Sequence, residues 1–472
     1  MRLTTTRLWA PILVAAICLP ASSAWAQQQQ GSQTNPVPPT GPATPTTQGQ
    51  QDKHQDPASP IATPTTITGD LAPSLSEGGS SRSTLQFGLH ADEFADSNLA
   101  GSLSSPGWGA TTDIGGHLDL HILRRSDDFT LSYTGGASIY SQSQYSQYDS
   151  TYQSVSAAEV LSFRRMTLHL NDQFAYLPES PFGFGGGGLG GLLGGFNLIN
   201  PNALPDQSAL TLQSQRLSNL VLAEADITTS ARTSWTITGS YGILHYLQSG
   251  FLQPSNYSFG VGYNRTLSAK QTIGVSYRLN LFRYNPNLSS INDQSVLVNY
   301  GYQTGGRLSF QFGGGPDFTS FTSLGSIAPA SRISWSANAG FTYQYNKTSL
   351  QFSAYRFVGG GAGLYLGAET SGFQFSATHP LGRFWTVSAS TGFVDSQSLS
   401  QTSATNTSYQ SWFFGASASR SISRTGSLFA RYNYQRELTN GNVCNGSLCL
   451  APFQRQQISV GFSWDMHAIA LQ

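Results

Sequence analysis

The sequence predicts an all-β fold: a single transmembrane antiparallel up-and-down β-barrel of about 18 strands, preceded by a disordered N-terminal leader. Three observations support this prediction. In long segments, apolar and polar residues alternate along the chain. Charged residues are scarce, and short turns alternate with longer connections between these segments. A strand that crosses a bilayer needs about 9–11 tilted residues, apolar towards the lipid and polar towards the lumen. Soluble sheets use strands of about five or six residues, and their outward face carries more charge.

The predicted strands recur as pairs of alternating segments joined by a short turn. The clearest such pair covers residues 331–357, SRISWSANAGFTYQYNKTSLQFSAYRF. The odd-numbered positions from Ile333 to Tyr345 are apolar or aromatic, and the even-numbered positions between them are small and polar. Successive side chains of a strand point to opposite faces, so this segment has one apolar face and one neutral polar face. The alternation resumes after a turn at residues 346–348, which predicts an antiparallel hairpin.

The composition excludes several kinds of protein. The chain has 472 residues, of which 10% are charged and 12% aromatic, and its formal net charge is zero. Such a neutral chain offers no basic surface, so we expect no nucleic-acid partner. Beyond the N-terminal segment, the sequence contains no apolar stretch long enough for a transmembrane helix. A sheet can then enter lipid only as a closed barrel, because lipid offers no hydrogen-bond partner to an open edge.

Two segments precede the predicted barrel. Two arginines stand before an apolar run at residues 8–19, and a small-x-small cleavage site follows, which predicts a secretory signal peptide over residues 1–26. Residues 27–82 are rich in Pro, Gln and Thr and poor in large apolar side chains, so we predict a disordered periplasmic leader. The leader is either a spacer or a segment that tethers the barrel or binds a periplasmic partner.

The barrel itself is predicted over residues 83–466, with a C-terminal tail at 467–472. Tight and longer connections alternate along these residues, which predicts about 18 strands. Strand boundaries predicted from sequence are loose, so the predicted range is 16–20 strands. An even count places both ends of the barrel on the side of the tight turns, which is the periplasm in such proteins. The tight connections are near 125–128, 164–165, 230–233, 268–271, 304–306, 346–348, 379–382 and 423–426. The longer ones are near 96–109, 141–153, 178–215, 248–254, 285–293, 313–330, 358–364, 395–407 and 438–453.

Aromatic residues gather towards the ends of the predicted strands, where rings with a polar tip favour the level of the lipid headgroups. The last predicted strand alternates polar residues with four apolar ones: Ile458, Val460, Phe462 and Trp464. In these features residues 83–466 resemble a porin-like outer-membrane β-barrel of a Gram-negative bacterium. The resemblance implies an outer-membrane location, contact with its lipid, and recognition of the closing strand by the barrel-assembly machinery. The sequence departs from that family's usual pattern because six residues follow Met466.

A cluster of titratable residues occupies the polar faces of the first two predicted strands: His90, Asp92, His117, Asp119 and His121. If these strands pair, the five side chains share a patch of lumen wall, where imidazoles and carboxylates can bind a divalent metal or a proton. Neighbours on one strand face stand about 6.5–7 Å apart, too far for one metal unless the paired strand supplies ligands. The simpler interpretation is a set of hydrated lumen residues, and we predict no metal, cofactor or catalytic residue.

The longest connection, residues 177–216, is more apolar than a loop in water needs to be. We hypothesise that it folds into the barrel mouth and narrows the pore. A collapsed external lid and a contact between subunits are the alternatives. Its glycines match G-x-G-x-x-G, but no βαβ unit surrounds them, which excludes a dinucleotide site. The apolar residues of this candidate constriction are Phe182, Phe184, Leu189, Leu192, Leu193 and Phe196.

Two cysteines remain after the signal peptide, Cys444 and Cys449, in the segment CNGSLC. In an oxidising compartment this spacing predicts a local disulfide. In the chain-entropy model a disulfide that closes so short a loop stabilises the folded state by about 2 kcal/mol. It would therefore stabilise the local loop and would not be needed for the fold.

The predicted function is that of an outer-membrane channel for passive diffusion of small polar solutes, with neutral, sugar-like molecules as the candidates. The alternative is a barrel that transports nothing and serves as an anchor or accessory for surface polysaccharide export or adhesion. A lipid-modifying enzyme is a third class, but neither a G-x-S-x-G elbow nor an H-E-x-x-H helix occurs, so we predict no enzyme. A homotrimer of such barrels is an assembly that the sequence leaves open.

Overall fold

The computed structural model describes the barrel and leaves out most of the N-terminal region and several connections. No helix in the described part of the chain is long and apolar enough to span a membrane. The predicted signal peptide and nearly all of the predicted leader lie outside the described residues. The described ranges are 67–68, 82–98, 107–141, 149–177, 215–247, 251–284, 290–304, 307–322, 330–361, 366–399, 408–440, 443–445, 448–450 and 452–471.

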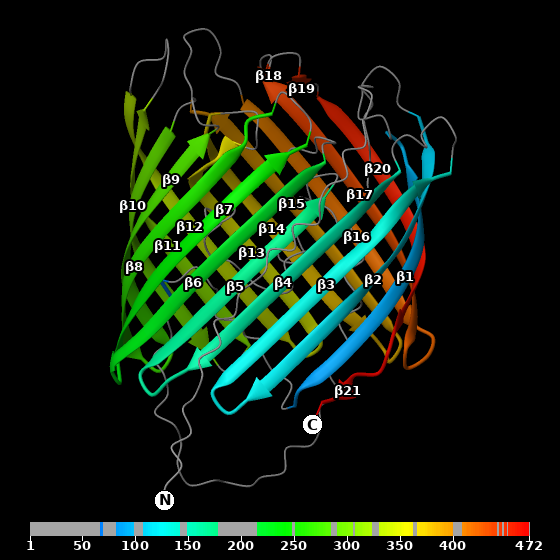
Figure 1. Cartoon of the computed structure of the whole chain (residues 1–472), viewed down its shortest axis with the longest axis horizontal. Helices are drawn as coiled ribbons and strands as arrows, with labels where there is room; N and C mark the ends of the chain where they lie inside the picture. Colours follow the sequence, from blue (N-terminus) through cyan, green and yellow to red (C-terminus); the bar gives the residue numbers. More distant parts are fainter. Residues whose placement is uncertain are drawn as a thin grey trace, which may run out of the picture. The chain divides into compact units, whose positions relative to one another are not determined.

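Within these ranges, eighteen long strands pair antiparallel in sequence order around a barrel (Figure 1). They are β1 (Thr84–Asp96), β2 (Gly109–Arg124), β3 (Asp127–Tyr140), β4 (Ser150–Ser162), β5 (Met166–Leu177), β6 (Arg216–Ser230), β7 (Thr233–Tyr246), β8 (Pro254–Ser268), β9 (Gln271–Tyr284), β10 (Ser290–Thr304), β11 (Leu308–Thr322), β12 (Ala330–Tyr345), β13 (Thr348–Gly359), β14 (Ala368–Leu381), β15 (Trp385–Ser398), β16 (Ser408–Ser421), β17 (Gly426–Asn440) and β20 (Phe453–Asp465). The predicted strand number is confirmed, as is the alternation of tight and long connections.

The barrel closes between its first and last long strands. β20 pairs with β17 on one side and with β1 on the other, where Gly88 faces Asp465 and Asp96 faces Gln457. The aromatic rings of Phe87 and Trp464 meet across this seam with centroids 5.6 Å apart. Each of the eighteen long strands described thus pairs with a strand on either side, which is the condition for a sheet in lipid.

The chain also continues along β1 beyond the residue at which the sequence places the end of the barrel. The short strand β21 (Ile469–Ala470) pairs with Leu85 and Thr84, one residue out of register with the β1–β20 ladder. A backbone hydrogen bond from Leu471 N–H to the carbonyl of Ser83 extends this pairing. Residues 469–471 therefore cover the start of β1.

The two predicted faces of the strands are confirmed by exposure. On β12, Ile333 is 75% exposed and Trp335 57%, whereas Ser336 on the opposite face is buried. On β8, the rings of Tyr257 and Phe259 are exposed and Ser258 between them is buried. Large apolar side chains exposed over the outside of a closed barrel form the band that contacts lipid. On these two strands the polar face therefore lines the interior.

A glycine-rich stretch that the sequence predicts to be a connection is part of a strand in the structure. The sequence predicts a connection over residues 313–330, but β11 continues to Thr322. A Cβ at Gly313 would lie 2.3 Å from the side-chain oxygens of Asn299 and of Asn338, so the glycine leaves room for both neighbours. Pro316 lies where the pairing between β10 and β11 is interrupted, which is a position where a strand tolerates a residue without an N–H.

A smaller correction concerns the predicted turn at residues 379–382. His379, Pro380 and Leu381 belong to β14, and the turn occupies residues 382–384. Gly382 has φ +69°, a left-handed conformation that glycine adopts without strain. Pro380 is tolerated because it stands one residue from the strand end, where the ladder loses little by a missing donor.

Adjacent residues near the middle of β13 test the assignment of faces. Phe352 points to the lipid, and Ser353 points into an open part of the lumen, opposite Gly340, whose Cβ position has nothing within 4 Å. We expect Phe352→Arg to lower the free energy of unfolding by about 2–4 kcal/mol, because an arginine is costly in the lipid-facing band. Ser353→Arg, the control, should change it little. Urea unfolding in lipid vesicles measures both, and an equal loss in the two variants would contradict the assignment.

Candidate functional site

The interior of the barrel is lined mostly by polar residues, with apolar ones such as Leu222 and Leu244 among them, and its two ends differ. On β2 the inward-facing Thr111 and Asp113 are fully buried, whereas His117 and Asp119, nearer the tight turn, are partly exposed. The same change along the strand is found on β4, where Ser150 and Ser154 are buried and Val160 is partly exposed. The lumen is therefore closely packed towards the long connections and more open towards the tight turns.

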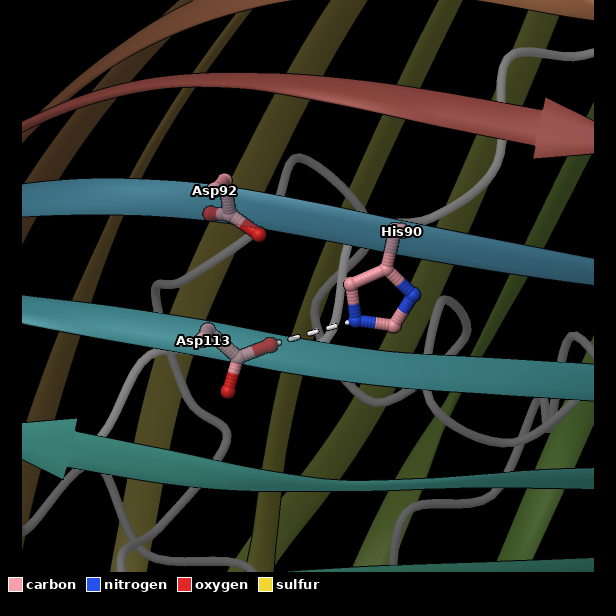
Figure 2. Close-up of side chains that lie close together, drawn as sticks. All are labelled: His90, Asp92 and Asp113. Carbon is pink, nitrogen blue, oxygen red and sulfur yellow. Dashed lines mark hydrogen bonds and ion pairs between the residues drawn. The ribbon is translucent and has the colours of Figure 1, made fainter.

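A buried polar group occupies the closely packed end of β1 and β2 (Figure 2). His90 and Asp92 belong to β1, and Asp113 on β2 stands directly opposite Asp92. His90 Nε2 lies 3.1 Å from Asp113 Oδ1 and 3.0 Å from the hydroxyl of Tyr152 on β4. The Tyr152 hydroxyl donates to Asp113 Oδ1 at 2.8 Å, and the hydroxyl of Ser138 donates to Oδ2 at 2.9 Å. Asp113 is thus held by three side chains from three strands.

Asp92 differs from its neighbours in having no such support. It is 4% exposed, and among the described residues neither of its carboxylate oxygens has a hydrogen-bond partner. Arg431 on β17 is the cation that interacts with both Asp92 and Asp113, and it does so through space without a hydrogen bond to Asp92. A buried carboxylate without a hydrogen bond is costly, so this position needs an explanation.

The other predicted residues of this cluster lie apart from the buried group. His117 is 3.2 Å from Asp465 on β20 and 3.9 Å from Asp119, in a more exposed part of the wall. His121 is 2.7 Å from Asp128 across the β2–β3 turn. The five predicted residues are thus divided among three places. Sequence reasoning missed Asp113 and Tyr152, although Asp113 shares the strand face of His117 and could have been found by parity.

The mouth at the end of the long connections is narrowed by an apolar cluster. Among the described residues its buried members come from four places in the chain: Phe282, Tyr284, Ile291, Val358 and Leu399. β13 pairs with β12 only up to Arg356, and beyond it Val358 packs on the inward faces of β9 and β10. The Tyr284 hydroxyl donates to the carbonyl of Gly360 at 3.1 Å. The end of the β13–β14 hairpin therefore leans into the lumen.

Ion pairs hold this hairpin where it separates from β12. Glu369 on β14 is nearly fully buried and pairs with Arg356 of β13 and with Arg332 of β12, the latter at 2.5 Å. The Arg356 guanidinium also lies 4.6 Å from the ring of Trp335. These contacts bridge the upper parts of β12 and β13, where the backbone ladder is missing. The predicted constriction by Phe182, Phe184, Leu189, Leu192, Leu193 and Phe196 lies outside the described residues.

Comparisons with known proteins give only distant likenesses. No family model and no curated protein matches the chain. Three solved structures from Pseudomonas aeruginosa are similar to it. OpdQ is 9% identical, covers 81% of this chain and 97% of its own, and has a TM-score of 0.39. OccK2 (OpdF) is 8% identical, with 82% and 98% covered and a TM-score of 0.42. OpdO is 11% identical, with 85% and 99% covered and a TM-score of 0.40.

The architecture of the chain itself decides its class. A closed barrel of eighteen antiparallel strands, apolar outside and polar inside, with tight turns at one end and long connections at the other, is the form of bacterial outer-membrane proteins. The protein is a porin-like outer-membrane β-barrel. Barrels of this form lie in bacterial outer membranes, which is the location that the sequence predicts.

The lumen of this porin-like barrel also holds two residues of the predicted leader. Ile67 and Thr68 are buried against the walls formed by β8, β9, β10 and β11. Ile67 N–H donates to Asn264 Oδ1 at 3.0 Å, Asn264 Nδ2 donates to the Thr68 hydroxyl at 2.8 Å, and Gln311 Nε2 donates to the Ile67 carbonyl at 2.9 Å. The sequence predicts a disordered periplasmic leader at these positions. The structure places these two residues inside the barrel, near the tight turns, and nearly all of the predicted leader lies outside the described residues.

The predicted disulfide lies on a small hairpin in the last long connection of the porin-like barrel. The short strands β18 (Val443–Asn445) and β19 (Leu448–Leu450) pair so that Cys444 and Cys449 are directly opposite each other. This backbone register suits a cross-strand disulfide, which stays a prediction.

A cross-link tests the docking of Ile67. A Cβ placed on Gly301 of β10 would lie 3.8 Å from the Cβ of Ile67, within the range that a disulfide needs. In a chain whose Cys444 and Cys449 are replaced by serine, we expect Ile67→Cys with Gly301→Cys to form an internal disulfide. Electrophoresis without reductant and mass spectrometry of the linked peptides measure it.

The control pairs Ile67→Cys with Gly340→Cys, a lumen position with nothing within 4 Å. This second pair should stay reduced. Equal cross-linking in both variants, or none in the first, would contradict the docked position of Ile67.

Proposed function

We propose that this barrel is a channel for passive diffusion of small polar solutes across the outer membrane. The observation that carries the proposal is the closed ring of eighteen strands with a polar inner wall. Barrels of 16–18 strands enclose an aqueous channel, whereas small barrels are filled by their own side chains. Open space next to Gly340 on the lumen wall is consistent with such a channel.

The charges on the inner wall favour neutral solutes over ions. Asp96 pairs with Arg455 at 2.7 Å, and Arg431 offsets part of the charge of Asp92 and Asp113. Selectivity between ions arises from rings of like charge, and these mixed, self-compensating pairs form no such ring. We therefore infer weak discrimination between anions and cations, with neutral polar molecules such as sugars as the solute class.

The narrowing of the lumen supports a limit on solute size. The apolar cluster around Ile291 and Val358 narrows the mouth, and Ile67 with Thr68 occupies part of the lumen near the tight turns. Small solutes pass such restrictions more easily than large ones. Diffusion without energy input needs no cofactor or catalytic group.

Planar-bilayer recording tests the channel. We expect the purified protein to give discrete current steps, with a reversal potential close to zero in a salt gradient because the wall charges compensate each other. Liposomes that contain the protein should swell in solutions of neutral sugars. Vesicles without protein are the control. Absence of current steps would favour the anchor or accessory function, and a large reversal potential would contradict the preference for neutral solutes.

A pair of substitutions on β10 tests the apolar cluster as a restriction. Ile291 is buried in the cluster, and Val298 on the same strand faces the lipid. Ile291→Ala removes packing that holds the hairpin end in the mouth, so we expect a larger unit conductance. Val298→Ala, a matched truncation outside the lumen, should leave it unchanged. If the two variants conduct like the natural protein, the cluster does not limit the current.

A further inference from the structure

We propose that His90, Asp92 and Asp113 form a binding site for a divalent transition-metal ion in the lumen wall. The three residues offer an imidazole nitrogen and two carboxylate oxygens, and these atoms all lie within 4.8 Å of one another (Figure 2). All three side chains are buried. One histidine with two carboxylates is a donor set suited to Zn²⁺ and related first-row ions, whereas Mg²⁺ and Ca²⁺ prefer oxygen ligands alone.

The electrostatics of the group favour a cation. Asp92 and Asp113 are direct cross-strand partners, and like charges in that arrangement repel each other. Both oxygens of Asp92 lack a hydrogen-bond partner among the described residues, although the side chain is 4% exposed. An ion bound between the two carboxylates would remove the repulsion and give Asp92 the partner that it lacks.

The supporting residues are arranged as they are around metal ligands. Ser138 and Tyr152 donate hydrogen bonds to Asp113, which fixes the direction of its carboxylate. Hydrogen bonds of this kind orient ligands and are needed for tight binding. Among the described residues no hydrogen bond fixes the carboxylate of Asp92 in the same way. Ligand atoms around a tetrahedral ion stand about 3.4 Å apart, so the three ligand atoms would have to draw closer together when the ion binds.

Glycines provide the space in which this group lies. A Cβ at Gly115 would stand 2.5 Å from Cε1 of His90, and one at Gly136 would stand 2.4 Å from the Tyr152 hydroxyl oxygen. A Cβ at Gly461 on β20 would stand 2.3 Å from the Cβ of Asp92. Three neighbouring strands thus leave a hollow in the wall that the ligand side chains fill.

Arg431 supplies the competing explanation. Its guanidinium interacts through space with Asp92 and Asp113, and it could be the only counter-charge that the carboxylates need. The two explanations give opposite signs for Asp92→Asn in the absence of metal. If Asp92 is a metal ligand, removing its charge relieves its repulsion with Asp113, and the unfolding temperature of the metal-free barrel rises. If Asp92 instead compensates the charge of Arg431, the same change leaves the guanidinium of Arg431 poorly compensated and lowers that temperature.

Zinc titration of the full-length barrel in detergent micelles, after treatment with EDTA, tests the proposal. We expect one zinc ion per chain by calorimetry, and a higher unfolding temperature with zinc. His90→Gln and Asp92→Asn should each weaken zinc binding at least tenfold. Co²⁺ should give a visible absorption band in the natural protein that His90→Gln abolishes.

His117→Gln is the matched control, because His117 also stands beside two carboxylates, those of Asp119 and Asp465, in a more exposed place. It should bind zinc like the natural protein. Absence of saturable zinc binding, or a loss in His117→Gln equal to that in His90→Gln, would overturn the proposal. A lower unfolding temperature of metal-free Asp92→Asn would do so as well. If Asp92→Asn does not fold, His90→Gln and the control decide the question alone.

Discussion

The structure depends on one constraint, which is that backbone N–H and C=O groups in lipid must find their partners within the protein. Eighteen strands meet it by pairing with both neighbours, and the pairing of β20 with β1 removes the last free edge. The ladder is interrupted at two places. One lies beside Pro316 of β11, a residue that has no N–H to pair, and the other is confined to the end of β12 and β13 near the long connections, where Glu369 joins Arg332 and Arg356.

Closure also decides what each side chain does. Along the paired parts of the strands, a residue contacts lipid or faces the lumen according to its parity, as Phe352 and Ser353 illustrate. Val358, beyond the end of the β12–β13 ladder, is an exception. The polar residues of all eighteen strands then share one enclosed space. In that space residues far apart in the sequence become neighbours: Arg455 meets Asp96, and Arg431 interacts with Asp92 and Asp113. Permeation and metal binding both rest on this gathering of polar groups from distant strands.

The lumen is partly occupied by side chains and backbone from three parts of the chain. The wall supplies buried polar groups such as His90 with Asp113, the β13–β14 hairpin supplies an apolar contact at the mouth, and the leader supplies Ile67 and Thr68. Each is seated against glycines or small residues that leave space on the wall. A wide barrel whose lumen is partly occupied in this way leaves a narrow passage, which suits small solutes.

The sequence by itself determined the barrel, its strand number and the two faces along most of the strands, because a two-residue period, tight turns and scarce charge are local features. It also placed His90 and Asp92 on the lumen wall. It did not reveal that Asp113 and Tyr152 join them, since that depends on the register between strands. The glycine-rich start of β11 was read as a connection, because the Asn299 and Asn338 side chains that its glycines accommodate belong to other strands. The docking of Ile67 was likewise decided by tertiary structure, because its partners Asn264 and Gln311 lie 197 and 244 residues away along the chain and come together only in the folded barrel.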